Sequence, residues 1–103
     1  MISNEMINNL VKIIVEEERP EKIILFGSYS AGVPNEESDV DILIVKETNV
    51  PKPKRAHRLL RRFSSYPFNT DIIVKTPEEF EKQASIPGSF VSIVKQRGKI
   101  LYG

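Results

Sequence analysis

The sequence KIILFGSYSAGVPNEESDVDILIV, residues 22–45, decides how this chain folds. An apolar run over residues 22–26 leads into the dipeptide Gly27-Ser28. Ten residues later the triplet Asp39-Val40-Asp41 opens a second apolar run over residues 42–45. Short apolar runs that are rich in branched residues and bounded by turn residues are typical of buried strands. This stretch therefore predicts two strands joined by a polar turn and a loop, with two acids at the start of the second strand.

The segments on either side alternate between helical and strand patterns. Apolar residues at helical spacing from Met6 to Val15 predict a helix that begins at Ser3 or Asn4 and ends before Pro20. Further helices are expected over residues 51–63, 77–84 and 89–96, with strands over residues 69–75 and 99–102 and a short helical turn over residues 28–31. The order predicts one α/β (or α+β) domain over residues 1–103, with a small mixed sheet and helices mainly on one face.

Composition narrows the class of protein. The chain has 103 residues, of which 15 are Lys or Arg and 14 are Asp or Glu, so its net charge of +1 does not favour general nucleic-acid binding. The absence of cysteine excludes disulfides, thiolate metal sites and a cysteine nucleophile. No apolar run approaches the length of a membrane span, and the N-terminal residues lack the pattern of a signal peptide. We therefore expect a cytoplasmic protein.

The acids at the start of the strands predict a metal site. Side chains alternate across a strand, so Asp39 and Asp41 are expected on the same face. Asp71 begins the next predicted strand and reaches the same point if the two strands are neighbours. Like charges side by side resist burial, whereas a divalent cation favours both carboxylates. Oxygen ligands suit Mg²⁺ or Mn²⁺, and three carboxylates can hold two Mg²⁺ ions, one at an attacking hydroxyl and one at a triphosphate.

Gly27 and Ser28 predict the complementary half of such a site. Glycine lets the backbone approach a ligand closely, and the amides of a following helical turn point at anions. The Ser28 hydroxyl adds a donor to phosphate. Each feature alone also has a structural explanation: Gly-Ser as an ordinary turn, Asp-x-Asp as a solvated strand end, and Asp71 as a turn cap. Because all of them lie at strand boundaries, together they indicate a metal-bound nucleoside triphosphate.

With these motifs at this spacing, the sequence resembles the minimal nucleotidyltransferases of the polymerase β superfamily. The resemblance covers most of the chain. Besides Gly27-Ser28 and the Asp39–Asp41 triplet, it includes TDIIV (residues 70–74), TPEE (76–79), PGSF (87–90) and GKILY (98–102). It implies a mixed sheet with flanking helices, two-metal transfer of a nucleoside monophosphate, and ATP as donor.

The resemblance also implies a role for each site residue. Gly27 and Ser28 are expected to hold the β- and γ-phosphates. Asp39 and Asp41 are expected to bind both metal ions, and Asp71 the ion beside the nucleophile, where it helps to deprotonate the acceptor. One position departs from the pattern: Ala31 precedes Gly32 where many relatives have an arginine, which removes one contact to the triphosphate.

Proteins of this size in the family resemble the antitoxins of two-component pairs with a helical HEPN-type ribonuclease toxin. The resemblance then implies AMP transfer to a toxin tyrosine. Two alternatives remain open: a binding module that masks its partner without catalysis, and nucleotidyl transfer to RNA or a small molecule. The acceptor, the nucleotide preference and the oligomeric state are not fixed by the sequence.

Basic residues gather on the predicted helix over residues 51–63. They are Lys54, Arg55, Arg58, Arg61 and Arg62. They form either a solvated face opposite the apolar stripe of Ala56, Leu59, Leu60 and Phe63, or a contact to a triphosphate, RNA or an acidic partner. His57 is expected on the surface or facing a partner, and Tyr66, Phe68 and Phe90 in the core or a partner contact.

Overall fold

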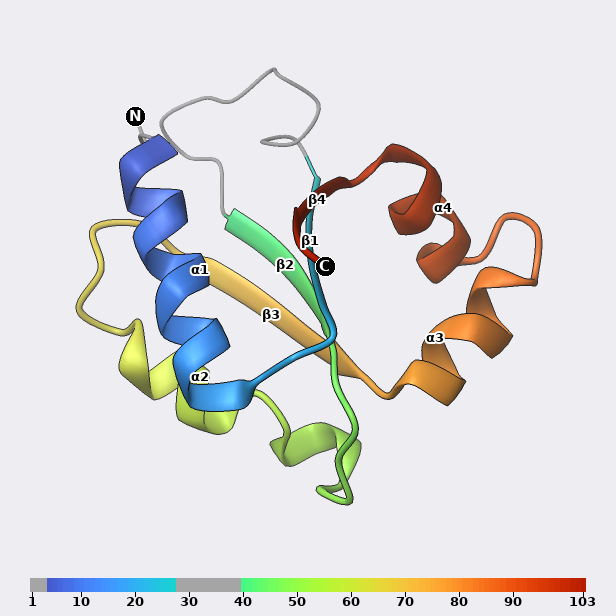
Figure 1. Ribbon diagram of the computed structural model, residues 1–103, viewed down its shortest axis with the longest axis horizontal. Coiled ribbons are helices and arrows are strands. Elements are labelled where there is room, and N and C mark those ends of the chain that lie inside the picture. The colour runs from blue at the N-terminus through green and yellow to red at the C-terminus, as the bar shows by residue number, and fades with distance from the viewer. Residues whose placement is uncertain (1–3, 28–39) are drawn as a thin grey trace.

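The computed structural model describes residues 4–27 and 40–103. Among these residues the chain forms a mixed four-stranded sheet in the order β3-β2-β1-β4, with two helices on each face (Figure 1). The strands are β1 (Lys22–Phe26), β2 (Val40–Val45), β3 (Thr70–Lys75) and β4 (Lys99–Tyr102). β1 pairs antiparallel with β2 and β4, whereas β2 and β3 are parallel. The predicted mixed sheet is confirmed, and the predicted bounds of β1 and β4 match those observed.

The helices are α1 (Asn4–Glu18), α2 (His57–Arg62), α3 (Pro77–Ala84) and α4 (Phe90–Arg97), with a 3₁₀ turn, η1, over Lys52–Lys54. The prediction that the helices lie mainly on one face is wrong. α1 and α2 cover one face and α3 and α4 the other. The physical reason lies in β2, whose side chains Ile42, Leu43, Ile44 and Val45 are all buried, so both faces of the central strand need a cover.

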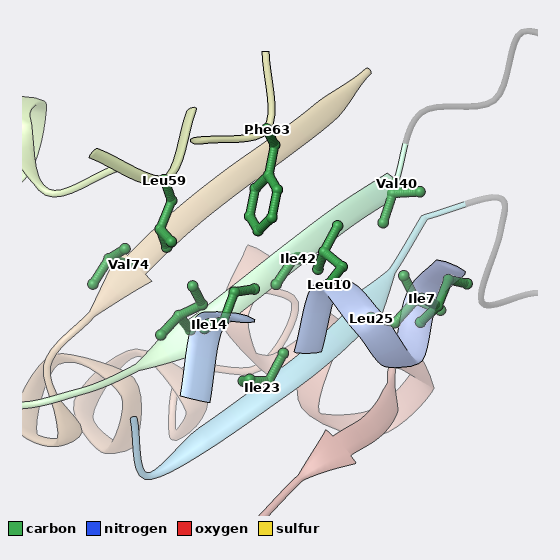
Figure 2. Packing of buried hydrophobic residues seen from close by; sticks show 11 residues of the cluster. Ile7, Leu10, Ile14, Ile23, Leu25, Val40, Ile42, Leu59, Phe63 and Val74 are labelled. Carbon is green, nitrogen blue, oxygen red and sulfur yellow. The ribbon is translucent and has the colours of Figure 1, made fainter. Parts of the chain in front are cut away.

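The larger core lies between the sheet and the helices α1 and α2. Ile7, Leu10 and Ile14 recur at helical spacing on α1 and pack with Leu59 and Phe63 of α2 (Figure 2). They meet the side chains of β1, β2 and β3 that point to this face, namely Ile23, Leu25, Val40, Ile42, Ile44 and Val74. Burial of this apolar surface is the main driving force for the fold.

The second core lies under α3 and α4. Leu43 and Val45 of β2 point to this face, where they pack with Phe80 of α3 and with Val91 and Val94 of α4. Since side chains alternate along a strand, Asp41 points to the same face as Leu43. The acids therefore lie on the α3–α4 side of the sheet, at the end where β2 begins.

The segment over residues 51–63 differs from the predicted continuous helix. It forms η1, a break at Arg55 and Ala56, and then the short helix α2. Pro51 and Pro53 remove two backbone donors from the first turns, which prevents a regular α-helix there. Of the predicted apolar stripe, Leu59 and Phe63 are buried, but Leu60 is 40% exposed, so α2 presents a narrower apolar face than the pattern indicated.

Glu79 ties three segments together. Its carboxylate accepts a hydrogen bond from the backbone N–H of Thr76, 2.8 Å away, in the predicted capping box of α3. It also forms a 2.7 Å ion pair with Arg55, which donates further hydrogen bonds to the carbonyls of Val50 and Val74. The hydrogen bond from the Arg55 guanidinium and that from Thr76 lower the pKa of Glu79 to about 2. This contact holds the β2–α2 connection against the start of α3.

Candidate active site at the start of β2 and β3

Asp41 and Asp71 are neighbours in the sheet. They are Cα partners in the parallel pair of β2 and β3, and Asp41 is also paired with Phe26 of β1. Adjacent strands lie about 4.8 Å apart, so the two carboxylates leave the same face of the sheet at short range. Asp41 is half-buried, whereas Asp71 is exposed. The expectation that the strand of Asp71 lies beside that of Asp41 is confirmed.

Gly27, the residue that follows β1, lies against the side chain of Asp41. Its φ of +81° lies in the left-handed region that favours glycine. A Cβ built on Gly27 would overlap Oδ2 of Asp41. Both the backbone conformation and the space therefore require glycine here, and any side chain at this position would collide with the Asp41 carboxylate.

Two predicted site residues, Ser28 and Asp39, lie outside the described residues. The same holds for the predicted helical turn over residues 28–31 and for Ala31. The structure thus brings together Gly27, Asp41 and Asp71. The roles of Ser28 and Asp39 remain predictions from the sequence.

The described part of the site fits a hard divalent cation in its donor chemistry. Two carboxylates in register repel each other unless a cation lies between them. His57, the single histidine of the chain, lies on α2 away from the pair. Among residues 4–27 and 40–103 there is no group of three or more His, Cys, Asp or Glu side chains placed to hold a metal. The third carboxylate expected from the sequence is Asp39.

Two cavities include residues of the site, one Asp71 and the other Gly27. The cavity beside β3 has a volume of about 350 Å³ and is lined by Tyr66, Asn69 and Asp71 among others. The cavity beside β1 has about 330 Å³ and is lined by Phe26, Gly27, Phe90, Ile93, Val94, Arg97 and Gly98. Phe26 and Phe90 meet edge to face at 5.2 Å. Asp71 thus borders one cavity, and Gly27 borders a second that is lined largely by apolar side chains.

No sequence pattern assigned Arg97 or Ile93 to the site. Both line the cavity that also contains Gly27, and Ile93 is 45% exposed. Phe90, expected in the core or a partner contact, packs on Phe26 yet keeps 47% of its surface exposed. The PGSF segment correctly predicted where α4 begins, with Ser89 as its N-cap. It did not indicate which side chains of α4 would border the cavity.

The basic residues of η1 and α2 lie at the other end of the sheet. Several of them line a cavity together with Lys46, the residue that follows β2. β2 rises about 3.3 Å per residue, so Lys46 lies about 16 Å from Asp41 along the strand. This separation argues against the hypothesis that this cluster contacts a triphosphate bound at Asp41.

Comparisons with known proteins agree with this geometry. Residues 7–101 match the family model of the nucleotidyltransferase domain. A protein of Methanocaldococcus jannaschii named "Putative protein adenylyltransferase MJ0141" is 37% identical over 83 residues, which cover 80% of this chain and 79% of the relative.

Two solved structures share the fold. One is that of the toxin–antitoxin MntA-HpeT with the mutation Y104A, with a TM-score of 0.65 and 25% identity over 99% of this chain and 74% of the other. The other is that of a toxin–antitoxin with AMP-PNP, with a TM-score of 0.57 and 25% identity over 93% of this chain and 73% of the other. The described helices include none long and apolar enough to cross a membrane. From the family match and the curated relative, the chain belongs to the nucleotidyltransferase domain family and is a nucleotidyltransferase.

Proposed function

We propose that this protein transfers AMP from ATP to a hydroxyl group of a protein, with Mg²⁺ as the metal, and that the acceptor is a tyrosine of a HEPN-type helical toxin. The observation that carries the proposal is the in-register pair Asp41 and Asp71, with Gly27 pressed against Asp41. The proposal is supported by a relative named for protein adenylyl transfer and by similarity to toxin–antitoxin structures, one of them with AMP-PNP. A cytoplasmic setting, as expected from the sequence, would supply the ATP.

Each residue has a role in the proposed reaction. Asp41 and Asp71, together with Asp39, would hold two Mg²⁺ ions. When bound, these ions neutralise the phosphate charge and lower the pKa of the acceptor hydroxyl. Gly27 lets the main chain after β1 lie close to the triphosphate, and Ser28 donates to a phosphate oxygen. The whole chain, residues 1–103, then acts as one minimal domain that relies on its partner for the acceptor.

The proposed step is an in-line displacement at the α-phosphorus. The acceptor oxygen forms a bond to phosphorus, the bond to the bridging oxygen of the β-phosphate breaks, and pyrophosphate leaves with the electron pair. The hydroxyl proton passes to Asp71, the exposed acid of the pair. Positioning and charge neutralisation supply most of the rate.

The test is intact-protein mass spectrometry of the chain incubated with ATP, Mg²⁺ and the product of the neighbouring gene, which the proposal expects to be a HEPN-type protein. The expected result is a mass gain of one AMP on the partner, mapped to a tyrosine. Asp41→Asn should abolish the gain while the variant stays folded, and Glu81→Gln, which neutralises an exposed acid on α3, should not. Labelling by Asp41→Asn at the rate of the wild type would refute the mechanism.

The same mixture separates the alternatives. Tight binding without a mass gain would show that the chain masks its partner and does not modify it. Labelling of tRNA or a small molecule in the absence of the partner would show that the acceptor is not a protein.

A further inference from the structure

A cavity of about 360 Å³ lies between the end of β2 and the η1–α2 segment. Six basic residues line it: Lys46, Lys54, Arg55, His57, Arg58 and Arg61. In Figure 1 the chain leaves β2 towards the bottom of the view and forms this segment there. Because the cavity lies at the opposite end of β2 from Asp41, it is separate from the candidate active site.

Two of the five Lys and Arg side chains in this lining are already paired within the fold. Lys46 forms a 2.9 Å ion pair with Glu18, whose side chain is only 8% exposed. Arg55 is held by Glu79 and by two backbone carbonyls, and its side chain is 10% exposed. Both side chains therefore form part of the cavity wall, and their charges are already paired with groups of the protein.

The other three Lys and Arg side chains of the lining are those left to meet a ligand. Lys54, Arg58 and Arg61 are exposed, and in the part of the chain that the structure describes they form no ion pair. Arg58 and Arg61 are three residues apart on α2, so their side chains are neighbours. α2 has no acidic residue to offset them. Like charges at this spacing destabilise a helix, and an anion in the hollow would relieve that repulsion.

The lining indicates which anion fits. A protein partner needs an apolar or aromatic centre that loses its water on binding, but Val50 is the one apolar side chain of this lining. Nucleic-acid interfaces are instead polar and positively charged, and Arg and Lys bind phosphate oxygens directly. We propose that this cavity binds the phosphodiester backbone of RNA, in addition to and independently of the proposed AMP transfer.

The experiment is fluorescence anisotropy of the full-length chain with a labelled single-stranded RNA of mixed sequence, without ATP or Mg²⁺. The test variant is Arg58→Gln/Arg61→Gln. The matched control is Lys12→Gln/Lys82→Gln, which removes the same charge from exposed positions on α1 and α3. The test variant is expected to lose at least tenfold in affinity, and the control less than threefold. The salt slope of log K should fall by about 0.7 for each lost phosphate contact.

Each outcome decides the question. Equal losses in both double variants, or no binding by the wild type at physiological salt, would overturn the proposal. Tripolyphosphate that displaces RNA at equal phosphate concentration would show a site for small anions instead. A polyglutamate peptide that binds more tightly than RNA would show a site for acidic proteins. Thermal melts of both double variants confirm that they are folded. Since no nucleotide is added, failure here leaves the proposed AMP transfer untouched.

Discussion

Gly27 and Asp41 are in contact across the antiparallel pair of β1 and β2: a Cβ on Gly27 would overlap the Oδ2 atom of Asp41. The two residues belong to different parts of the site, one to the turn expected to hold phosphate and the other to the acids expected to hold metal. Their contact means that the position of the main chain after β1 and the position of the carboxylate depend on each other. Several consequences can be measured.

Gly27→Ala should displace the Asp41 carboxylate. The methyl group would occupy the space of Oδ2, and the left-handed backbone adds strain of about 1 kcal/mol. We expect AMP transfer to fall at least tenfold, measured as the initial rate of partner labelling. The matched control is Gly88→Ala, whose φ is +78° but whose added Cβ meets nothing within 4 Å. It should lose similar stability and keep its rate. Equal rates for the two variants would contradict the proposed coupling.

Asp71→Asn should raise the stability of the metal-free protein. Asp71 lies beside Asp41 in register, and like charges directly opposite each other on adjacent strands destabilise a sheet by about 0.2–1 kcal/mol. The same substitution should reduce the stabilisation that Mg²⁺ gives the wild type, because one ligand is lost. Urea unfolding with and without Mg²⁺ measures both effects, with Glu81→Gln as the control. If Mg²⁺ stabilises Asp71→Asn as much as the wild type, Asp71 is not a ligand.

Much of the site was predictable because it depends on local patterns. The branched apolar runs predicted the positions of β1 and β2. Because the acids directly precede the second run, they were expected at the start of β2. The contact of Gly27 with Asp41 was not predictable, since it depends on the register in which Phe26 faces Asp41. Register depends on how both strands pack on their neighbours, and the periodicity of a single strand does not determine it.

Arg55 illustrates the same limit outside the site. Its sequence context, among other basic residues, indicated a solvated or ligand-binding face. In the structure it is largely buried and paired with Glu79, 24 positions away. The capping box between Thr76 and Glu79 was predicted correctly because it spans one helical turn. The second use of the Glu79 carboxylate, by Arg55, requires the tertiary fold.

Glu79→Gln should remove a pH-dependent part of the stability. The pKa of Glu79 is lowered from 4.5 to about 2 in the folded state, chiefly by the hydrogen bond from Arg55. A lowered pKa stabilises the fold above the unfolded value of 4.5, and this contribution is lost as the pH falls from 4.5 towards 2. Since the Glu79 side chain is 21% exposed, solvent screening leaves a contribution on the order of 1–2 kcal/mol.

Urea unfolding at a series of pH values measures the Glu79 contribution. The free-energy difference between the wild type and Glu79→Gln should be largest near pH 6 and shrink towards pH 2. Glu78→Gln is the matched control, because Glu78 is an exposed acid in the same first turn of α3. A difference that does not change with pH would show that Glu79 acts through packing alone.

Gly98→Ala should displace the C-terminal end of α4 and lower the stability of the fold. Gly98 ends α4, and its N–H donates a 2.7 Å hydrogen bond to the carbonyl of Val94. An added Cβ would lie 2.5 Å from Cγ2 of Ile24 and 2.5 Å from the Val94 carbonyl oxygen, so the helix end must shift. Overpacking of this kind costs about 1–3 kcal/mol, measurable by urea unfolding. Gln96→Ala, at an exposed position on the same helix, should change stability by less than about 0.5 kcal/mol.

Because Gly98 also lines the cavity beside Gly27, Gly98→Ala should in addition lower the rate of partner labelling. An unchanged rate would show that this cavity takes no part in transfer.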